Sequence, residues 1–273
     1  MFELLREMLS YGFMQRALVV GLLMALCAAL LGVSLVLKRY SMIGDGLSHV
    51  GFGALAVAVA FNWAPLAFAV PVVMAAAFLL LRVSETSHIK GDSAVALIST
   101  TALAVGVLVV SLRRGINTDI YNYMFGSILA MSQNDVTLSV VLSVVVLLVF
   151  VVFYKQIFAV TFDEGFARAT GTKTGVYNTL IALLTAVTIV LGMRMVGTLL
   201  ISSLVIFPAL TAMRVCKRFR TVTITAAIVS VVCFMAGLLV SFGAGTPAGA
   251  SVVAANAVMF AIFSLAGRIL RRD

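Results

Sequence analysis

The chain has 273 residues, of which 63% are hydrophobic and only 11% are charged. This composition excludes a soluble globular domain and is typical of a polytopic membrane protein. The net charge of +9 does not indicate nucleic-acid binding, because the Lys and Arg residues lie in short loops between apolar runs.

Nine apolar segments follow along the chain, each close to the ~20 residues that a helix needs to cross a bilayer. Their expected bounds are 12–37, 42–61, 65–82, 92–112, 135–154, 175–193, 196–213, 221–243 and 247–267. Between the fourth and the fifth, residues 117–134 hold a shorter apolar part, Tyr121 to Met131, which predicts a re-entrant or interfacial helix. Since the chain has no long linker, we expect an all-α protein with a single transmembrane domain over residues 1–273.

The distribution of basic residues predicts the orientation in the membrane. Fourteen of the nineteen Lys and Arg residues lie on one side of the predicted spans. The other side holds Arg6, Arg16, Arg113, Arg114 and Arg194. By the positive-inside rule, the N-terminus is expected outside and the C-terminus in the cytoplasm of a cell (inner) membrane protein.

The second span carries two ionisable residues in the stretch SMIGDGLSHVGFGALAVA, residues 41–58. At ~1.5 Å per residue, His49 lies roughly 12 Å into the membrane, and Asp45 shares its helix face one turn away. Ionisable residues at this depth are costly and mark functional sites by default. A carboxylate and an imidazole form half of a transition-metal site. The alternative is a structural hydrogen-bonded pair between helices.

A short helix is expected in the loop between Lys155 and Lys173, which contains TFDEGFARATG. Thr161 or Asp163 suits its N-cap and Gly171 its end, with Ala167 between them on the same face.

Three further positions are candidates for the pathway or for gating. Asp92 opens the fourth span, where it also suits a helix cap. Asp119 is expected outside, where it could attract a cation or belong to a simple turn. Pro208 is expected to kink the seventh span.

Six stretches in the same order resemble the membrane permeases of ABC importers for zinc, manganese and related divalent metals. They are LKRYSMIGDGLSHVGFGA, KGDSAVAL, YNYMFGSIL, FDEGFARATG, MRMVGTLLISSLVIFPALTA and GTPAGASVV. The resemblance covers nearly the whole chain and implies a fold similar to that of the cobalamin and siderophore importer permeases.

The resemblance also implies partners. Similar proteins form a homodimer that carries two copies of a separate cytoplasmic ATPase and receives metal from an extracytoplasmic binding protein. It assigns the loop helix, with Asp163, Glu164, Ala167 and Gly171, to docking with the ATPase. The chain itself contains no GxxxxGK[ST] loop, so ATP hydrolysis is expected in the partner and no permanently bound cofactor is expected here.

The predicted function is therefore transport of a divalent metal into the cytoplasm by a non-enzymatic permease subunit. Imidazole with carboxylate favours zinc, with manganese next. A proton-coupled secondary metal transporter is the alternative, because Asp45 and His49 could also relay protons. If the pathway follows a dimer axis, both residues from each copy would give four ligands to one ion.

Overall fold

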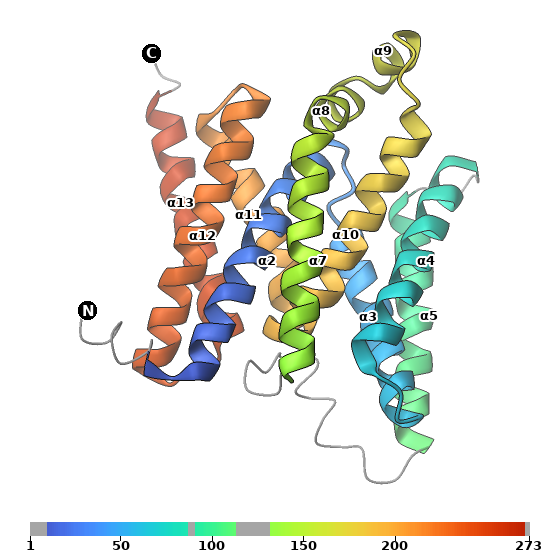
Figure 1. Ribbon diagram of the computed structural model, residues 1–273. Helices are drawn as coiled ribbons and strands as arrows, with labels where there is room; N and C mark the ends of the chain where they lie inside the picture. Colours follow the sequence, from blue (N-terminus) through green and yellow to red (C-terminus); the bar gives the residue numbers. More distant parts are fainter. Residues whose placement is uncertain (1–9, 87–90, 113–131, 271–273) are drawn as a thin grey trace.

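The structure is a computed structural model that describes residues 10–86, 91–112 and 132–270 (Figure 1). Its long helices are α2 (Gly12–Leu37), α3 (Ile43–Ala60), α4 (Pro65–Thr86), α5 (Gly91–Leu112), α7 (Gln133–Val152), α10 (Thr174–Val196), α11 (Thr198–Val215), α12 (Phe219–Ala244) and α13 (Ala248–Leu270). Two short helices, α8 (Tyr154–Phe162) and α9 (Glu164–Ala169), connect α7 to α10.

All nine predicted spans are helices in the structure. By length and composition, eight of the described helices can cross a membrane, and the ninth, α11, is a shorter apolar helix. The predicted re-entrant helix at Tyr121–Met131 falls on residues outside the described ranges, and Gln133 already belongs to α7. The all-helical polytopic fold is thus confirmed.

The helices form two groups that α10 joins. Helices α3, α4 and α5 pack together on one side, and α2, α11, α12 and α13 pack together on the other (Figure 1). Helix α10 contacts α2, α3, α4 and α11, so it lies between the groups. The helices with the most buried spans are α2, α3 and α10, whereas α5 and α13 present most of their side chains outward.

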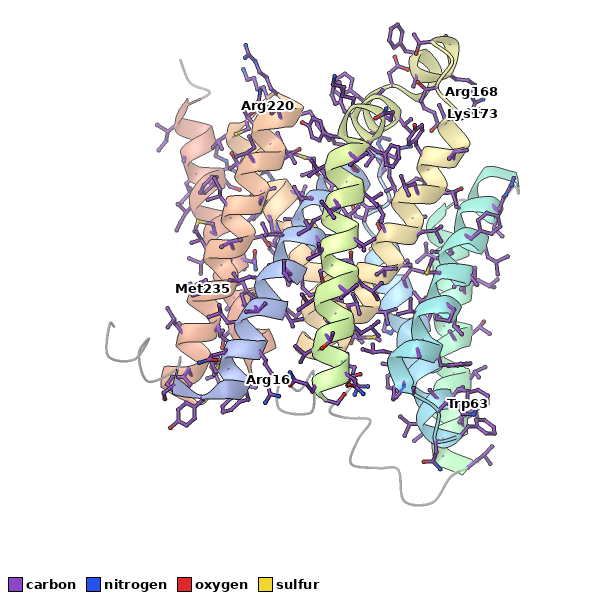
Figure 2. All side chains as sticks on the ribbon, in the orientation of Figure 1. Arg16, Trp63, Arg168, Lys173, Arg220 and Met235 are labelled. Carbon is purple, nitrogen blue, oxygen red and sulfur yellow. The ribbon has the colours of Figure 1, made fainter. Side chains whose placement is uncertain are left out.

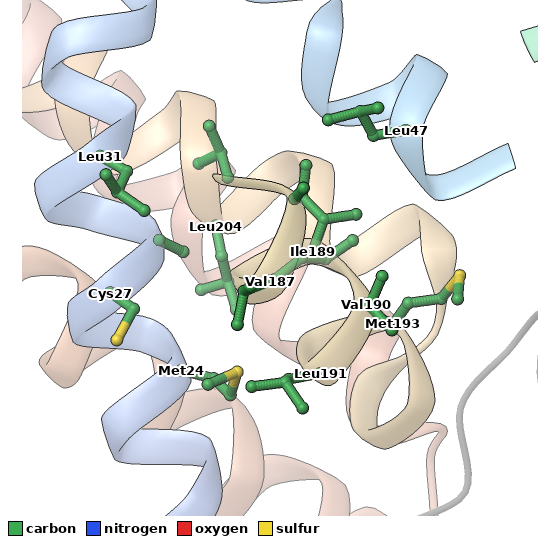
Figure 3. Packing of buried hydrophobic residues seen from close by; sticks show 14 of the residues in the cluster. Met24, Cys27, Leu31, Leu47, Val187, Ile189, Val190, Leu191, Met193 and Leu204 are labelled. Atoms are coloured by element: carbon green, nitrogen blue, oxygen red, sulfur yellow. The ribbon is translucent and has the colours of Figure 1, made fainter. Parts of the chain in front are cut away.

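The central core lies where α2, α10 and α11 meet (Figure 3). Met24 and Leu31 of α2 face Leu191 of α10 and Leu204 of α11, and all four are almost completely buried. Lipid tails are as apolar as these side chains, so close packing rather than hydrophobicity holds such helices together. Gly32 of α2 serves this packing, because a Cβ there would overlap the carbonyl of Val205 in α11.

The two ends of the bundle differ in chemistry. One end carries α8 and α9 and is called the α9 end, and Arg168, Lys173 and Arg220 lie there (Figure 2). The opposite end carries Trp63, whose ring lies 5.2 Å from that of Phe61. Aromatic rings of this kind are typical of a membrane–water interface.

Candidate functional site

Helix α3 presents Asp45 and His49 on a narrow open stripe of an otherwise buried helix. Fourteen of its eighteen residues are buried, and the remaining four are Asp45, His49, Val57 and Val59. Asp45 and His49 are one turn apart, so their side chains lie on the same face. In the separate chain, the two ionisable groups are therefore accessible from outside the bundle.

The two side chains are close enough to bind one ion together. Nε2 of His49 lies 3.6 Å from Oδ2 of Asp45, and the side chains are 32% and 44% exposed. This distance is too long for a hydrogen bond but suits two ligands that are each about 2 Å from a common ion. Ser48 donates its hydroxyl to the backbone carbonyl of Asp45 at 2.7 Å, so that bond does not occupy the carboxylate.

Asp45 and His49 alone would be only part of a metal site. Among the described residues, no group of three or more His, Cys, Asp or Glu side chains could hold a metal ion. Tetrahedral zinc sites have four ligands, so an ion at Asp45 and His49 needs further ligands from water, from another chain or from residues outside the described ranges.

Close packing with α5 and α10 fixes the orientation of α3. A Cβ at Gly53 would lie 2.5 Å from the carbonyl oxygen of Ala102 in α5, and one at Gly106 would lie 2.8 Å from the Cα of Gly53. On another side, a Cβ at Gly51 would lie 2.7 Å from Cε of Met193 in α10. The sides of α3 that carry Gly51 and Gly53 are thus covered by neighbours, and the Asp45 and His49 side is more open.

The short helix α9 begins and ends as its sequence predicts. Asp163 is the N-cap and accepts a hydrogen bond from the backbone N–H of Phe166 at 2.9 Å. The helix ends in a Schellman motif, with Gly171 at a φ of 86° and the N–H of Thr172 bonded to the carbonyl of Ala167 at 2.9 Å. Of the two predicted caps, Asp163 is the one used, because Thr161 lies within α8.

The side chains of α9 divide between the bundle and solvent. Ala167 is fully buried, so it anchors the helix to the bundle and is not available to a partner in this arrangement. Phe166 and Phe162, by contrast, are 66% and 73% exposed at the α9 end. These two aromatic side chains form an exposed apolar surface at this end, and neither was a candidate from the sequence.

A buried lysine ties α9 to the end of α2. Nζ of Lys38 lies 3.3 Å from Oε2 of Glu164 and 2.5 Å from Oδ1 of Asn178 in α10. Nδ2 of Asn178 donates to Oε1 of Glu164 at 3.2 Å, which closes a three-residue network that we call the Lys38 clasp. In the sequence, Lys38 is one of the basic residues that predict the topology, and its position at the end of an apolar run was a signal for a further role.

The clasp keeps Glu164 ionised. Burial opposes its ionisation, but the hydrogen bond from Asn178 and the charge and hydrogen bond of Lys38, with a further contribution from Arg168, lower the pKa of Glu164 below its ordinary 4.5. The stabilisation from this charge is complete above the unfolded-state pKa and is lost as the pH falls through the lower folded-state value. The clasp is therefore intact at neutral pH.

A second ion pair joins α7 to α10 at the opposite end. NH2 of Arg194 lies 2.8 Å from Oδ2 of Asp135, and the side chains are only 11% and 14% exposed. Asp135 also forms a capping box with Ser132 at the start of α7. Neither residue was a candidate in the sequence analysis, because the pairing joins positions 59 residues apart.

The remaining candidates do not gather around Asp45 and His49 in the described residues. Asp92 is the second residue of α5, but its side chain is not described, and Asp119 lies outside the described residues. Pro208 is buried within α11, and the helix continues through it to Val215. A pathway or gating role for these three stays a prediction.

Comparison with known proteins places this arrangement in a family. Residues 10–267 match the ABC 3 transport family. This chain belongs to the ABC 3 transport family. It is accordingly a multi-pass membrane permease subunit of an ABC transport system, and the expected resemblance is confirmed.

Relatives of the permease match over nearly its full length. The manganese transport system membrane protein MntC of Halalkalibacterium halodurans is 28% identical over 94% of this chain and 88% of its own length. The high-affinity zinc uptake system membrane protein ZnuB of Haemophilus influenzae is 30% identical over 90% of this chain and 94% of its own.

Solved structures show the same fold. A chain of PsaBC from Streptococcus pneumoniae, in complex with Fab, has a TM-score of 0.85 and 26% identity, and the match covers 96% of this chain and 94% of that one. An inward-facing metal-chelate type ABC transporter has a TM-score of 0.75 at 16% identity, over 92% and 85% of the chains, and that likeness concerns the fold alone.

Proposed function

We propose that the permease moves a divalent transition-metal ion into the cytoplasm through a site that includes Asp45 and His49. The observation that carries the proposal is the pairing of a carboxylate and an imidazole, 3.6 Å apart, on the open stripe of a helix that is otherwise buried. The printed names of the relatives, which describe manganese and zinc transport, support the same class of cargo.

Zinc is the proposed ion, with manganese as the competing one. Imidazole nitrogen is a good ligand for zinc, and the affinity of such a site for divalent ions rises from manganese toward zinc. Selective delivery by a separate binding protein could reverse this preference in the cell. The ion is cargo and not a resident cofactor, so the site must release it as readily as it captures it.

The proposal includes the partners that drive transport. Two copies of the permease, two cytoplasmic ATPase chains and an extracytoplasmic binding protein form the working importer. The α9 end faces the cytoplasm, as the basic side chains of this end favour. Helix α9 is the docking element for the ATPase, with the exposed Phe166 of α9 and the adjacent Phe162 at the end of α8 as apolar contacts.

Metal uptake by reconstituted importer tests the proposal. Permease, ATPase and binding protein are incorporated into liposomes, and uptake of radioactive zinc or manganese is followed after ATP is added. Asp45→Asn and His49→Ala should each reduce uptake to the background level, because each removes one of the two ligands on α3. ATPase binding and insertion should be unchanged, since neither residue takes part in the described packing of α9.

His88→Ala, at the other histidine of the chain, is the matched control for His49→Ala and should leave uptake unchanged. Near-normal uptake in both Asp45→Asn and His49→Ala would rule out the metal site. Uptake by the permease alone, without the ATPase, would instead favour a proton-coupled carrier.

A further inference from the structure

Lys38 occupies a position where three helices meet at the α9 end. It is the C-cap of α2, and its side chain is only 10% exposed. Its ammonium group lies within 3.3 Å of Glu164, the first residue of α9, and bonds Asn178 near the start of α10. A charge buried this far needs such partners, so the state in which Lys38 contacts Glu164 and Asn178 is strongly favoured over one in which it is separated from them.

The turn after Lys38 is fixed by backbone hydrogen bonds and leads directly into α3. The N–H of Tyr40 bonds the carbonyl of Leu35 at 2.8 Å, and the N–H of Arg39 bonds that of Val36 at 3.1 Å. Arg39 has a φ of 62°, so these residues form a Schellman motif without the usual glycine. Five residues, 38–42, separate α2 from α3.

The connection continues into the first turns of α3 through further backbone hydrogen bonds. The N–H of Ile43 bonds the carbonyl of Tyr40 at 3.0 Å, and the N–H of Gly46 bonds that of Met42 at 3.0 Å. Asp45 therefore lies seven positions after Lys38 on a stretch in which successive turns are hydrogen-bonded. A displacement of Lys38 along the bundle must also displace the start of α3.

We infer that Lys38 is a positioning residue that transmits movement of α9 to the metal-binding helix α3. When an ATPase pulls α9, Glu164 moves, Lys38 follows, and the hydrogen-bonded turn carries the shift to Asp45 and His49. This inference rests on the proposed function, because it assumes both an ATPase at α9 and a metal ion at α3. It assigns a transport role to a lysine that otherwise serves only as a topological charge.

Other contacts of α9 do not reach α3 in this way. Arg168 also lies 3.4 Å from Glu164, but its other hydrogen bond is to Thr174 in α10. Helix α10 offers a second route, since Met193 near its far end packs against Gly51 of α3. That contact lies beyond Asp45 and His49 along α3, whereas the Lys38 turn joins α3 at its first residue. The two routes can be separated by substitution, because changing Lys38 leaves the Glu164–Asn178 bond and the Met193–Gly51 contact of the α10 route in place.

The test measures zinc delivered per ATP hydrolysed in liposomes that contain permease, ATPase and binding protein. Lys38→Met keeps the length and apolar stem of the side chain but removes its charge. It should lower the zinc-to-ATP ratio roughly tenfold, the scale of one charge-assisted hydrogen bond, while the ATPase still binds and hydrolyses ATP. Lys38→Arg keeps a positively charged donor for both Glu164 and Asn178 and should restore most of the ratio. If Lys38 only filled space, the larger arginine would not restore it.

Two further variants make the result specific to the clasp. Lys155→Met removes an exposed lysine of α8 at the same end and should leave the ratio unchanged. Glu164→Gln keeps the side-chain shape, so it should reproduce Lys38→Met, and the double variant should be no worse than either single one. If Lys38→Met fails to assemble, Glu164→Gln removes the same charge pair from its acidic side, and its amide oxygen can still accept the bond from Asn178.

A wild-type zinc-to-ATP ratio in the assembled Lys38→Met or Glu164→Gln variant would overturn the inference, as would fully additive losses in the double variant. Failure of the proposed function is distinguishable, because the wild-type importer itself would then deliver no zinc to the liposomes.

Discussion

At the scale of single residues, Gly53 decides how close α3 lies to α5. A Cβ at this position would meet the Ala102 carbonyl oxygen at 2.5 Å, and that atom is backbone, which cannot rotate away. Gly53→Ala should therefore separate α3 from α5 and destabilise the permease by about 1–3 kcal/mol. Thermal unfolding of the purified protein in detergent measures the loss.

Gly44, in the same helix, is the matched control for Gly53. Among the described residues, no atom outside the local backbone of α3 lies within 4 Å of a Cβ built there, so Gly44→Ala should keep the packing and gain up to about 1 kcal/mol of helix propensity. Equal melting temperatures for the two variants would contradict the close contact between α3 and α5.

Local signals in the sequence predicted some residues and not others. Asp45 and His49 were identifiable because an ionisable side chain in an apolar run costs free energy, which indicates a function. Asp163 and Gly171 were identifiable because helix caps bond to residues close by in the sequence. The Lys38 clasp was not identifiable, since Lys38 and Glu164 are 126 residues apart and each is ordinary in its own loop. Such pairs are set by helix packing, which single-sequence patterns do not encode.

At the scale of elements, the ion pair between Arg194 and Asp135 fastens α7 to α10. Asp135→Asn keeps the shape and can still accept the capping bond from Ser132, but it removes the carboxylate charge that faces Arg194 in a nearly buried position. Breaking a buried pair from one side costs about 3–5 kcal/mol, so the melting temperature should fall by several degrees. The measurement is thermal unfolding at fixed detergent concentration.

An exposed contact between α2 and α7, at the same end of the bundle as the Arg194–Asp135 pair, provides the comparison. NH1 of Arg16 donates to Oε1 of Gln133 at 2.8 Å in an exposed setting, and Arg16→Gln should change stability by less than about 1 kcal/mol. A similar loss in Arg16→Gln and Asp135→Asn would show that the burial of the Asp135 pair has no special effect.

The sequence predicted which segments are helices better than it predicted how those helices pack. The nine apolar runs became nine helices because backbone groups in a bilayer must bond within their own segment. Helix α8 was missed, because its nine residues mix Lys155 and Gln156 with apolar side chains and resemble a loop. Its buried residues, Ile157, Val160 and Thr161, recur at helical spacing, so packing against the bundle decides its structure.

At the scale of the whole molecule, the permease presents apolar surface beside the proposed metal site at Asp45 and His49. Helix α5, which packs on α3, exposes Leu97, Leu108 and Leu112 by 64%, 62% and 83%. Lipid would cover such a face, and so would a second copy. The pattern of α5 is the same for lipid and for a second copy, because both surroundings are apolar. The polar pair on the neighbouring α3 is the feature that separates the two.

The incomplete site favours a second copy and predicts its metal stoichiometry. Closed homodimers are two-fold symmetric, so a site on the axis receives Asp45 and His49 from both chains, and two carboxylates then balance the charge of one divalent ion. The intact dimer should therefore bind one zinc per two chains, and a mixed dimer with His49→Ala in only one copy should lose most of this binding. Native mass spectrometry of differently tagged copies measures both, whereas two zinc ions per dimer, or half the binding in the mixed dimer, would place a separate pathway in each chain.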